Sequence, residues 1–144
     1  MTSTPPSCIA PALLQAYRET DYIVHATPGF VLHVDVPSAG LAAYFQQRAI
    51  AAGCLITACN PFSQPLADAD NQARQARLEQ ALQQAGWHWV RAVGKHPGNA
   101  WPPEVGCFVE GMDEKAARKW GRDYGQNAVV WCGADAIARL LLLR

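Results

Sequence analysis

The chain lacks an excess of charge of either sign. Its 144 residues contain 12 Lys and Arg and 12 Asp and Glu, so the formal net charge is zero. A protein that binds nucleic acid generally needs surplus cations to displace counterions from the phosphates. The chain also has no uninterrupted apolar run of about 18 residues, the length that a transmembrane helix needs. We therefore expect neither nucleic acid nor a membrane as a partner.

The short motifs that carry well-known chemistry are also missing. The sequence has no HExxH, GxSxG, P-loop or GxGxxG pattern and no paired CxxC. Metal and dinucleotide chemistry therefore lack support, and we expect neither a metal nor a cofactor. The N-terminus has no basic region followed by an apolar run, so we expect no secretory signal and a cytoplasmic location.

Cysteine is present in an odd number, and no two cysteines have CxxC spacing. The five are Cys8, Cys54, Cys59, Cys107 and Cys132, and four of them lie in apolar runs that favour strands. We interpret them as small buried hydrophobic residues in a reducing compartment. A catalytic thiolate would need an electropositive or His-paired setting, which the sequence does not show around any of them.

The sequence does contain enough apolar residues for a folded core. Half of the residues are hydrophobic and 17% are charged, which suits one globular domain of this length. We expect residues 1–16 to form a partly disordered N-terminal arm and residues 17–144 to form one domain of the α/β class. The α+β class is the alternative.

Hydrophobic patterns predict the elements of this domain. They predict an N-terminal β-hairpin from residues 21–26 and 30–36, further strands at 54–59, 87–93, 105–110 and 128–132, helices at 40–52, 67–85 and 113–123, and a short terminal helix from Asp135. The expected architecture is a mixed sheet of five or six strands with three to four helices. The first crossover helix is expected to join parallel strands in a right-handed connection.

The long predicted helix carries polar residues on the face that should turn towards the sheet. Asn71 and Arg74 continue the stripe formed by Leu78 and Leu82. They should lie beyond the end of the preceding strand, where ligands often bind in open α/β sheets. Two interpretations stay open. Asn71 and Arg74 tie down the 60–66 loop through its carbonyls, or Arg74 binds an anionic or carboxyl group.

Further polar residues could complete such a ligand site. Asn60, Ser63 and Asn71 would orient the ligand, and Gln126 would extend the wall, although backbone capping explains Gln126 equally well. The 94–104 loop would form the lid and is the source of Trp101, although such loops are more often solvated connections. Catalysis would have to use Glu104 or His96, because no activated nucleophile is visible.

Three segments together resemble a known family. They are Ile56-Thr-Ala-Cys-Asn-Pro-Phe-Ser63, Asn71-Gln-Ala-Arg74 and Tyr124-Gly-Gln-Asn-Ala-Val-Val-Trp131. In this order they are similar to the bacterial domain of unknown function 3293 family, over roughly residues 17–141. The resemblance implies a small, stand-alone, cytoplasmic bacterial protein without an assigned reaction. The family often has a Ser two residues after the Glu of the loop, where this chain has Gly106.

These observations favour a small-ligand site for an anionic or carboxyl-bearing molecule at the strand ends. The alternative is a non-enzymatic interaction module that uses the apolar Leu140–Leu143 segment and exposed Trp residues. Its partner would be another protein or a second copy in a homodimer. A concave pocket lined by Arg74 and Gln126 would support the first hypothesis. A flat apolar patch, with Arg74 fully bonded to backbone carbonyls, would support the second.

Overall fold

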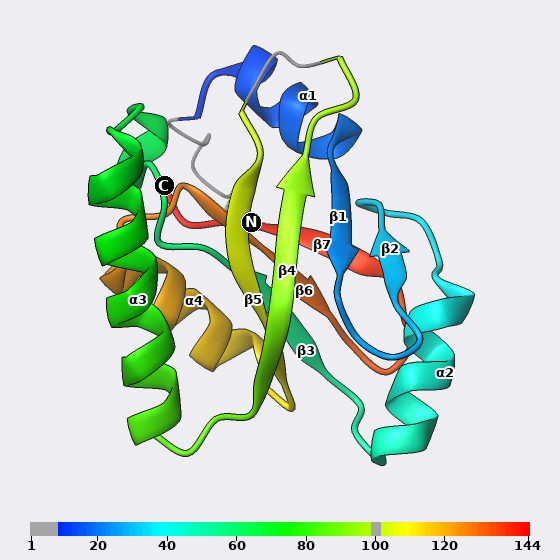
Figure 1. Cartoon of the computed structure of the whole chain (residues 1–144). Helices are drawn as coiled ribbons and strands as arrows, with labels where there is room; N and C mark the ends of the chain where they lie inside the picture. Colours follow the sequence, from blue (N-terminus) through cyan, green and yellow to red (C-terminus); the bar gives the residue numbers. More distant parts are fainter. Residues whose placement is uncertain (1–8, 99–101) are drawn as a thin grey trace, which may run out of the picture.

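The computed structural model describes residues 9–98 and 102–144 (Figure 1). In chain order the elements are α1 (Pro11–Glu19), β1 (Asp21–Val24), β2 (Phe30–Leu32), α2 (Ala39–Arg48), β3 (Gly53–Ile56), η1 (Pro61–Ser63), α3 (Asp68–Gln84), β4 (Trp89–Lys95), β5 (Glu104–Glu110), α4 (Glu114–Asp123), β6 (Ala128–Cys132) and β7 (Ala138–Leu142). The described residues thus contain four α-helices, within the expected number, and seven strands instead of five or six. None of the described helices has both the length and the apolar character needed to span a bilayer.

The strands of the described residues form one sheet in the order β2-β1-β4-β5-β3-β6-β7, and every pairing in it is antiparallel. The predicted N-terminal hairpin is confirmed, with Tyr22 opposite Leu32. The predicted mixed sheet is wrong, although the first crossover helix, α2, does join two strands that run in the same direction, β2 and β3. The connecting helices all join strands of the same direction, but these strands are never neighbours: three strands lie between β2 and β3, and one lies between each of the other two pairs. For example, α3 leads from β3 to β4, and β5 separates the two.

The sheet curls until its two outer strands approach each other near α2 (Figure 1). There the Asp35 backbone N–H, just after β2, donates to the carbonyl of Ala138 at the start of β7, at 2.7 Å. An isolated antiparallel bridge between Pro37 and Ile137 continues this contact. The curl gives the sheet an inner face, towards which both edges bend, and an outer face.

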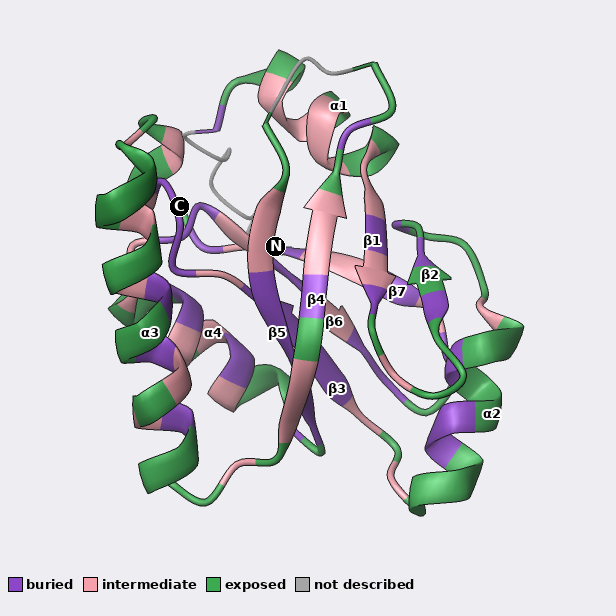
Figure 2. Cartoon of the chain, in the orientation of Figure 1, coloured by how far each residue is buried: buried purple, intermediate pink, exposed green. Residues whose placement is uncertain are grey.

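Side chains alternate between two cores, one on each face of the sheet. The buried residues are concentrated in the central strands, β3 and β5 (Figure 2). In β3, Leu55 belongs to the inner core, which contains Phe108, whereas Cys54 and Ile56 belong to the outer core, which contains Leu78 of α3. Helix α2 packs into the inner core, while α3 and α4 cover the outer face (Figure 1). Helix α1 lies over the other half of the inner face, and this half holds the candidate site.

The predicted terminal helix from Asp135 is wrong, because residues 138–142 form strand β7 paired with β6. Asp135 and Arg139 do form an ion pair at the i,i+4 spacing of a helix. Ala136 between them, however, has a φ of 57°, in the left-handed region that a right-handed helix cannot contain. The pair therefore closes a turn that leads into a strand.

Local signals place most helix ends, but α2 and α1 differ from the expectation. The predicted N-cap Asp113 is confirmed, since its carboxylate accepts from the Ala116 N–H at 2.8 Å. Helix α2 ends four residues before the expected stop at Gly53, because Ala49 takes a left-handed conformation with a φ of 54°. Helix α1 covers Pro11–Glu19, where the sequence suggested an arm up to residue 16.

Candidate functional site

A cavity of about 90 Å³ lies between α1 and the inner face of the sheet. The inner-face residues that line it include small side chains, namely Gly94 of β4, Thr57 just after β3 and Ala128 of β6. Further along the same face, fully buried Phe108 fills the space. Since protein interiors are close-packed, a void remains where the side chains are too small to fill it. The run of small residues under α1 therefore accounts for the cavity.

The cavity has an apolar floor and a polar wall. Leu55, Val130 and Leu140 of the sheet supply much of the floor, together with Leu13 of α1. The side chains with polar groups are Tyr17, Thr20, Tyr22, Thr57, Asn60, Ser63, His96, Glu104 and Gln126. A mainly apolar surface with a few converging polar groups is typical of sites for small molecules.

The fold brings together five of the residues that the sequence singled out: Asn60, Ser63, His96, Glu104 and Gln126 all line the cavity. They come from the segments after β3 and β4, the first residue of β5 and the turn before β6. These four positions meet at the α1 end of the inner face, although the chain separates them by up to 66 positions. Trp101 lies outside the described residues. A binding or catalytic role for any of these residues stays a prediction.

Arg74 and Asn71 are absent from the residues that line this cavity and instead hold the neighbouring loop. Arg74 Nε donates to the carbonyl of Ala58 at 2.7 Å, and Nη2 donates to the carbonyl of Tyr124 at 2.9 Å. Asn71 Oδ1 accepts from the Asn60 N–H at 2.9 Å, and its Nδ2 donates to Asn60 Oδ1 at 2.8 Å. These contacts are those of a structural tie, and the guanidinium hydrogen bonds extend from α3 to the chain beyond β3 and α4.

The short loop after β3 has an unusual backbone conformation. Asn60, Phe62 and Ser63 have φ values of 47°, 56° and 58°, in the left-handed region that costs non-glycine residues free energy. The Phe62 N–H donates to the carbonyl of Gly125 at 2.7 Å, which fastens the loop to the turn before β6. Ser63 Oγ lies 2.8 Å from the Tyr17 hydroxyl and accepts from Asn127 Nδ2 at 2.8 Å. The surrounding contacts thus hold the loop in this conformation and direct Ser63 towards α1.

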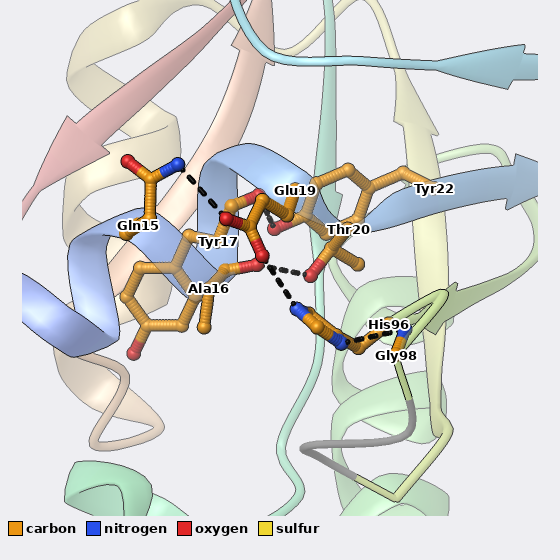
Figure 3. A network of polar contacts seen from close by, with 8 residues as sticks. All are labelled: Gln15, Ala16, Tyr17, Glu19, Thr20, Tyr22, His96 and Gly98. Atoms are coloured by element: carbon orange, nitrogen blue, oxygen red, sulfur yellow. Dashed lines mark hydrogen bonds and ion pairs between the residues drawn. The ribbon is translucent and has the colours of Figure 1, made fainter.

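His96 joins the loop after β4 to α1 (Figure 3). Its Nδ1 accepts from the Gly98 N–H at 3.1 Å, so in the neutral ring the proton is on Nε2, which donates to Glu19 Oε2 at 3.0 Å. Hydrogen bonds from Gln15 and then from His96 lower the pKa of Glu19. Both ring nitrogens of this buried imidazole are therefore occupied, and His96 would have to leave Glu19 or Gly98 to transfer a proton to a ligand.

Tyr22 and Glu104 lie on the inner face, on strands β1 and β5. Burial raises the pKa of Tyr22 above its usual value despite a hydrogen bond to Thr20, and the charge of Glu104 adds to the rise. The phenol therefore stays protonated and donates to the carbonyl of Tyr17 at 3.1 Å (Figure 3). Glu104 brings a carboxylate to the wall of a cavity whose floor is apolar.

Sequence reasoning missed four polar residues of the wall, namely Tyr17, Thr20, Tyr22 and Thr57. Tyr17 was placed at the edge of the expected arm, and no local pattern shows that α1 docks over the sheet. Tyr22 and Thr57 lie in or beside strands that were predicted, but their inward direction was not used. For Tyr22 the period-2 alternation was an available signal, since it shares the inner face with Val24 two residues later.

The described thiols do not form a reactive site. Cys54, Cys59, Cys107 and Cys132 are buried and unpaired. Burial raises the pKa of Cys107 and of Cys132 to about 12, so both stay protonated at neutral pH. Among the described residues no group of three or more His, Cys, Asp or Glu side chains is placed to hold a metal ion.

Comparison with known proteins gives one family. A family described as "Protein of unknown function (DUF3293)" matches residues 56–129, which run from the last residue of β3 through the loop with Asn60 and Ser63, α3, β4, β5 and α4 to the start of β6. No curated protein and no solved structure matches the chain. The chain belongs to the DUF3293 family, as the three sequence segments indicated.

Proposed function

We propose that this protein binds a small organic molecule in the cavity between α1 and the inner face of the sheet. The observation that carries the proposal is the composition of the wall, where an apolar floor faces polar groups from five separate segments of the chain. A void in a close-packed interior forfeits dispersion contacts of its lining atoms, which a ligand of the right shape can restore.

The size of the cavity limits the ligand. A volume of about 90 Å³ is smaller than the several hundred Å³ of a typical drug-sized pocket. The occupant is therefore a small molecule, unless α1 moves outwards on binding. Because α1 has no fully buried side chain, outward movement exposes little core surface.

A thermal-shift screen against small metabolites tests the proposal. A ligand present at 100 times its dissociation constant should stabilise the fold by about 2.7 kcal/mol. Ala128→Leu fills the cavity from the inner face of β6 and should abolish that shift. Ala73→Leu, at an exposed position of α3, adds the same atoms outside the cavity and should leave the shift unchanged. Equal ligand shifts in both variants would show that binding occurs elsewhere.

The alternative is a non-enzymatic interaction module. The described apolar residues that suggested it do not form an exposed surface. Leu141 and Leu143 are buried in the outer core, and the described Trp residues are at least partly buried. Arg74 does bond to backbone carbonyls, as that alternative required, but a concave pocket lined by Gln126 accompanies it. We therefore place small-molecule binding first. We also propose the cytoplasm as its compartment, where the four buried thiols would stay reduced.

A further inference from the structure

The carboxylate and the imidazole of the cavity wall are already engaged within the protein. Among the described residues that line the cavity there is no Lys or Arg, and Glu104 takes part in an interaction of its own within the chain. His96 donates to Glu19 and accepts from the Gly98 N–H, which uses both of its ring nitrogens. A charged group that enters this largely apolar enclosure therefore loses its hydration and finds no free counter-ion on the described wall. Because such burial of a charge is costly, the wall favours an uncharged ligand.

The wall also holds a hydrogen-bond acceptor that is not used within the described chain. Gln126 Nε2 donates to the carbonyls of Cys59 at 3.2 Å and of Tyr124 at 3.3 Å, which uses both of its hydrogens and fixes the orientation of the amide. Its Oε1 has no hydrogen-bond partner in the part of the chain that the structure describes. A ligand group that donates to Oε1 therefore completes the hydrogen bonds of this buried side chain.

The same wall keeps hydrogen-bond donors as well. Ser63 Oγ accepts from Asn127 Nδ2 at 2.8 Å and shares one hydrogen with the Tyr17 hydroxyl, also at 2.8 Å, so one of the two hydroxyl hydrogens is left over. Asn60 Oδ1 accepts from Asn71 Nδ2 at 2.8 Å, which leaves the Nδ2 of Asn60 as a further donor. A ligand group that only donates, such as an ammonium, or only accepts, such as a carboxylate, would satisfy one half of this wall.

We propose that the ligand of this cavity is an uncharged molecule whose polar end both donates and accepts hydrogen bonds, as a primary amide or a hydroxyl group does. The polar end donates to Gln126 Oε1 and accepts from the spare hydroxyl, and a short apolar part packs on Leu55, Val130 and Leu140. This inference rests on the proposed small-molecule binding. It replaces the anionic ligand that the sequence favoured, because the cation expected to bind that ligand, Arg74, is bonded to two carbonyls outside the cavity.

Five probes of one chain length separate charge from hydrogen bonding: butanamide, 1-butanol, butanenitrile, butylammonium and butanoate. The nitrile is uncharged and accepts hydrogen bonds but cannot donate them. Each probe is titrated into the full-length ¹⁵N-labelled protein, and amide shifts of the cavity residues are followed by NMR. The variants are Gln126→Met, which keeps the length and removes the amide, and Ala128→Leu, which fills the cavity. Gln80→Met, at an exposed position on α3, is the matched control for loss of one amide.

We expect the tighter of butanamide and 1-butanol, which identifies the polar end, to bind at least tenfold more tightly than the other three probes. Gln126→Met should abolish its advantage over the nitrile, Gln80→Met should preserve that advantage, and Ala128→Leu should abolish binding. If a charged probe or the nitrile binds the wild-type cavity as tightly, or if the advantage survives in folded Gln126→Met, this inference is overturned while small-molecule binding stands. If Gln126→Met does not fold, the probe series on the wild type decides alone. If none of the five probes shifts the cavity resonances, both proposals are overturned.

Discussion

At the scale of single residues, Arg74 connects segments that are distant in sequence. It extends from α3, and its guanidinium reaches carbonyls after β3 and after α4. Arg74→Ala leaves both carbonyls without this donor. Because a hydrogen bond to a charged group contributes about 1.5–3 kcal/mol, we expect the free energy of unfolding, measured by urea denaturation, to fall by about 2–3 kcal/mol.

Two further variants show whether this loss comes from the guanidinium contacts. Arg74→Lys keeps the charge but not the planar fork, so its stability should lie between those of the wild type and Arg74→Ala. Arg77→Ala removes an exposed arginine from the same helix and should change stability by less than about 0.5 kcal/mol. The structural tie is refuted if Arg74→Ala costs no more than Arg77→Ala.

Glu110, at the end of β5, is a buried carboxylate held by two basic side chains. Arg48 donates to it from Nε at 2.8 Å and from Nη2 at 3.0 Å, and His88 Nε2 lies 2.9 Å from Oε2. Burial raises the pKa of Glu110, but the hydrogen bond from Arg48 and the charges of His88 and Arg48 outweigh it, and the pKa lies below the ordinary value.

A carboxyl group with a lowered pKa stabilises the fold above its unfolded pKa, about 4.3, and this contribution is lost as the pH falls through the folded pKa. We expect Glu110→Gln to be less stable than the wild type at pH 7 by about 1.5–3 kcal/mol. The difference should shrink below about pH 4.3, because the wild-type carboxyl group then takes up its proton. Chemical denaturation over a pH series measures this, with exposed Glu114→Gln as the control. A constant gap at every pH would contradict the prediction.

At the scale of elements, α1 is attached mainly by polar contacts. Its hydrogen bonds to the rest of the chain include Tyr17 to Ser63 at 2.8 Å and Glu19 to His96 at 3.0 Å, and the helix has no buried residue. Elements with few buried apolar contacts open locally at low free-energy cost. Covering the cavity and opening easily are therefore properties of the same helix.

Hydrogen exchange tests this behaviour of α1. We expect its amides to exchange faster than those of β3, whose residues are all buried. Tyr17→Phe removes a hydrogen bond of about 0.5–1.5 kcal/mol and should speed exchange in α1 by roughly 2- to 10-fold. Arg18→Ala, at an exposed position of the same helix, is the control and should not do so. Identical exchange in wild type and Tyr17→Phe would contradict this prediction.

Elements with a local signal could be predicted, and those that depend on tertiary contacts could not. The N-cap at Asp113 and the strand at residues 128–132 follow from adjacent residues, and the structure confirms both. The strand at 138–142 depends instead on pairing with β6, and no residue near it in the sequence indicates that pairing. The i,i+4 spacing of Asp135 and Arg139 is compatible with a helix, but the left-handed backbone conformation of Ala136 excludes one there.

At the scale of the whole molecule, the order of strands was beyond the reach of sequence reasoning. A helix between two strands normally predicts parallel neighbours. Here one strand lies between the two strands that α3 joins and between the two that α4 joins, and three lie between those that α2 joins. Part of the candidate site could still be anticipated, because Asn60, Ser63 and Gln126 are polar residues next to apolar strands. That they share a cavity with His96 and Glu104 depends on the curl of the sheet, which no short pattern encodes.

The meeting of the two outer strands near α2 also affects how copies of this chain can associate. Unpaired backbone groups along an edge strand are a template for strand addition, the first step of β-aggregation. Within the described residues, β2 is three residues long, and the chain after it is bonded to Ala136 and Ala138. On β7, Arg118 donates to the carbonyl of Leu142 at 3.2 Å. An incoming strand thus finds little open edge, and self-association of the folded protein would have to proceed through side-chain surfaces.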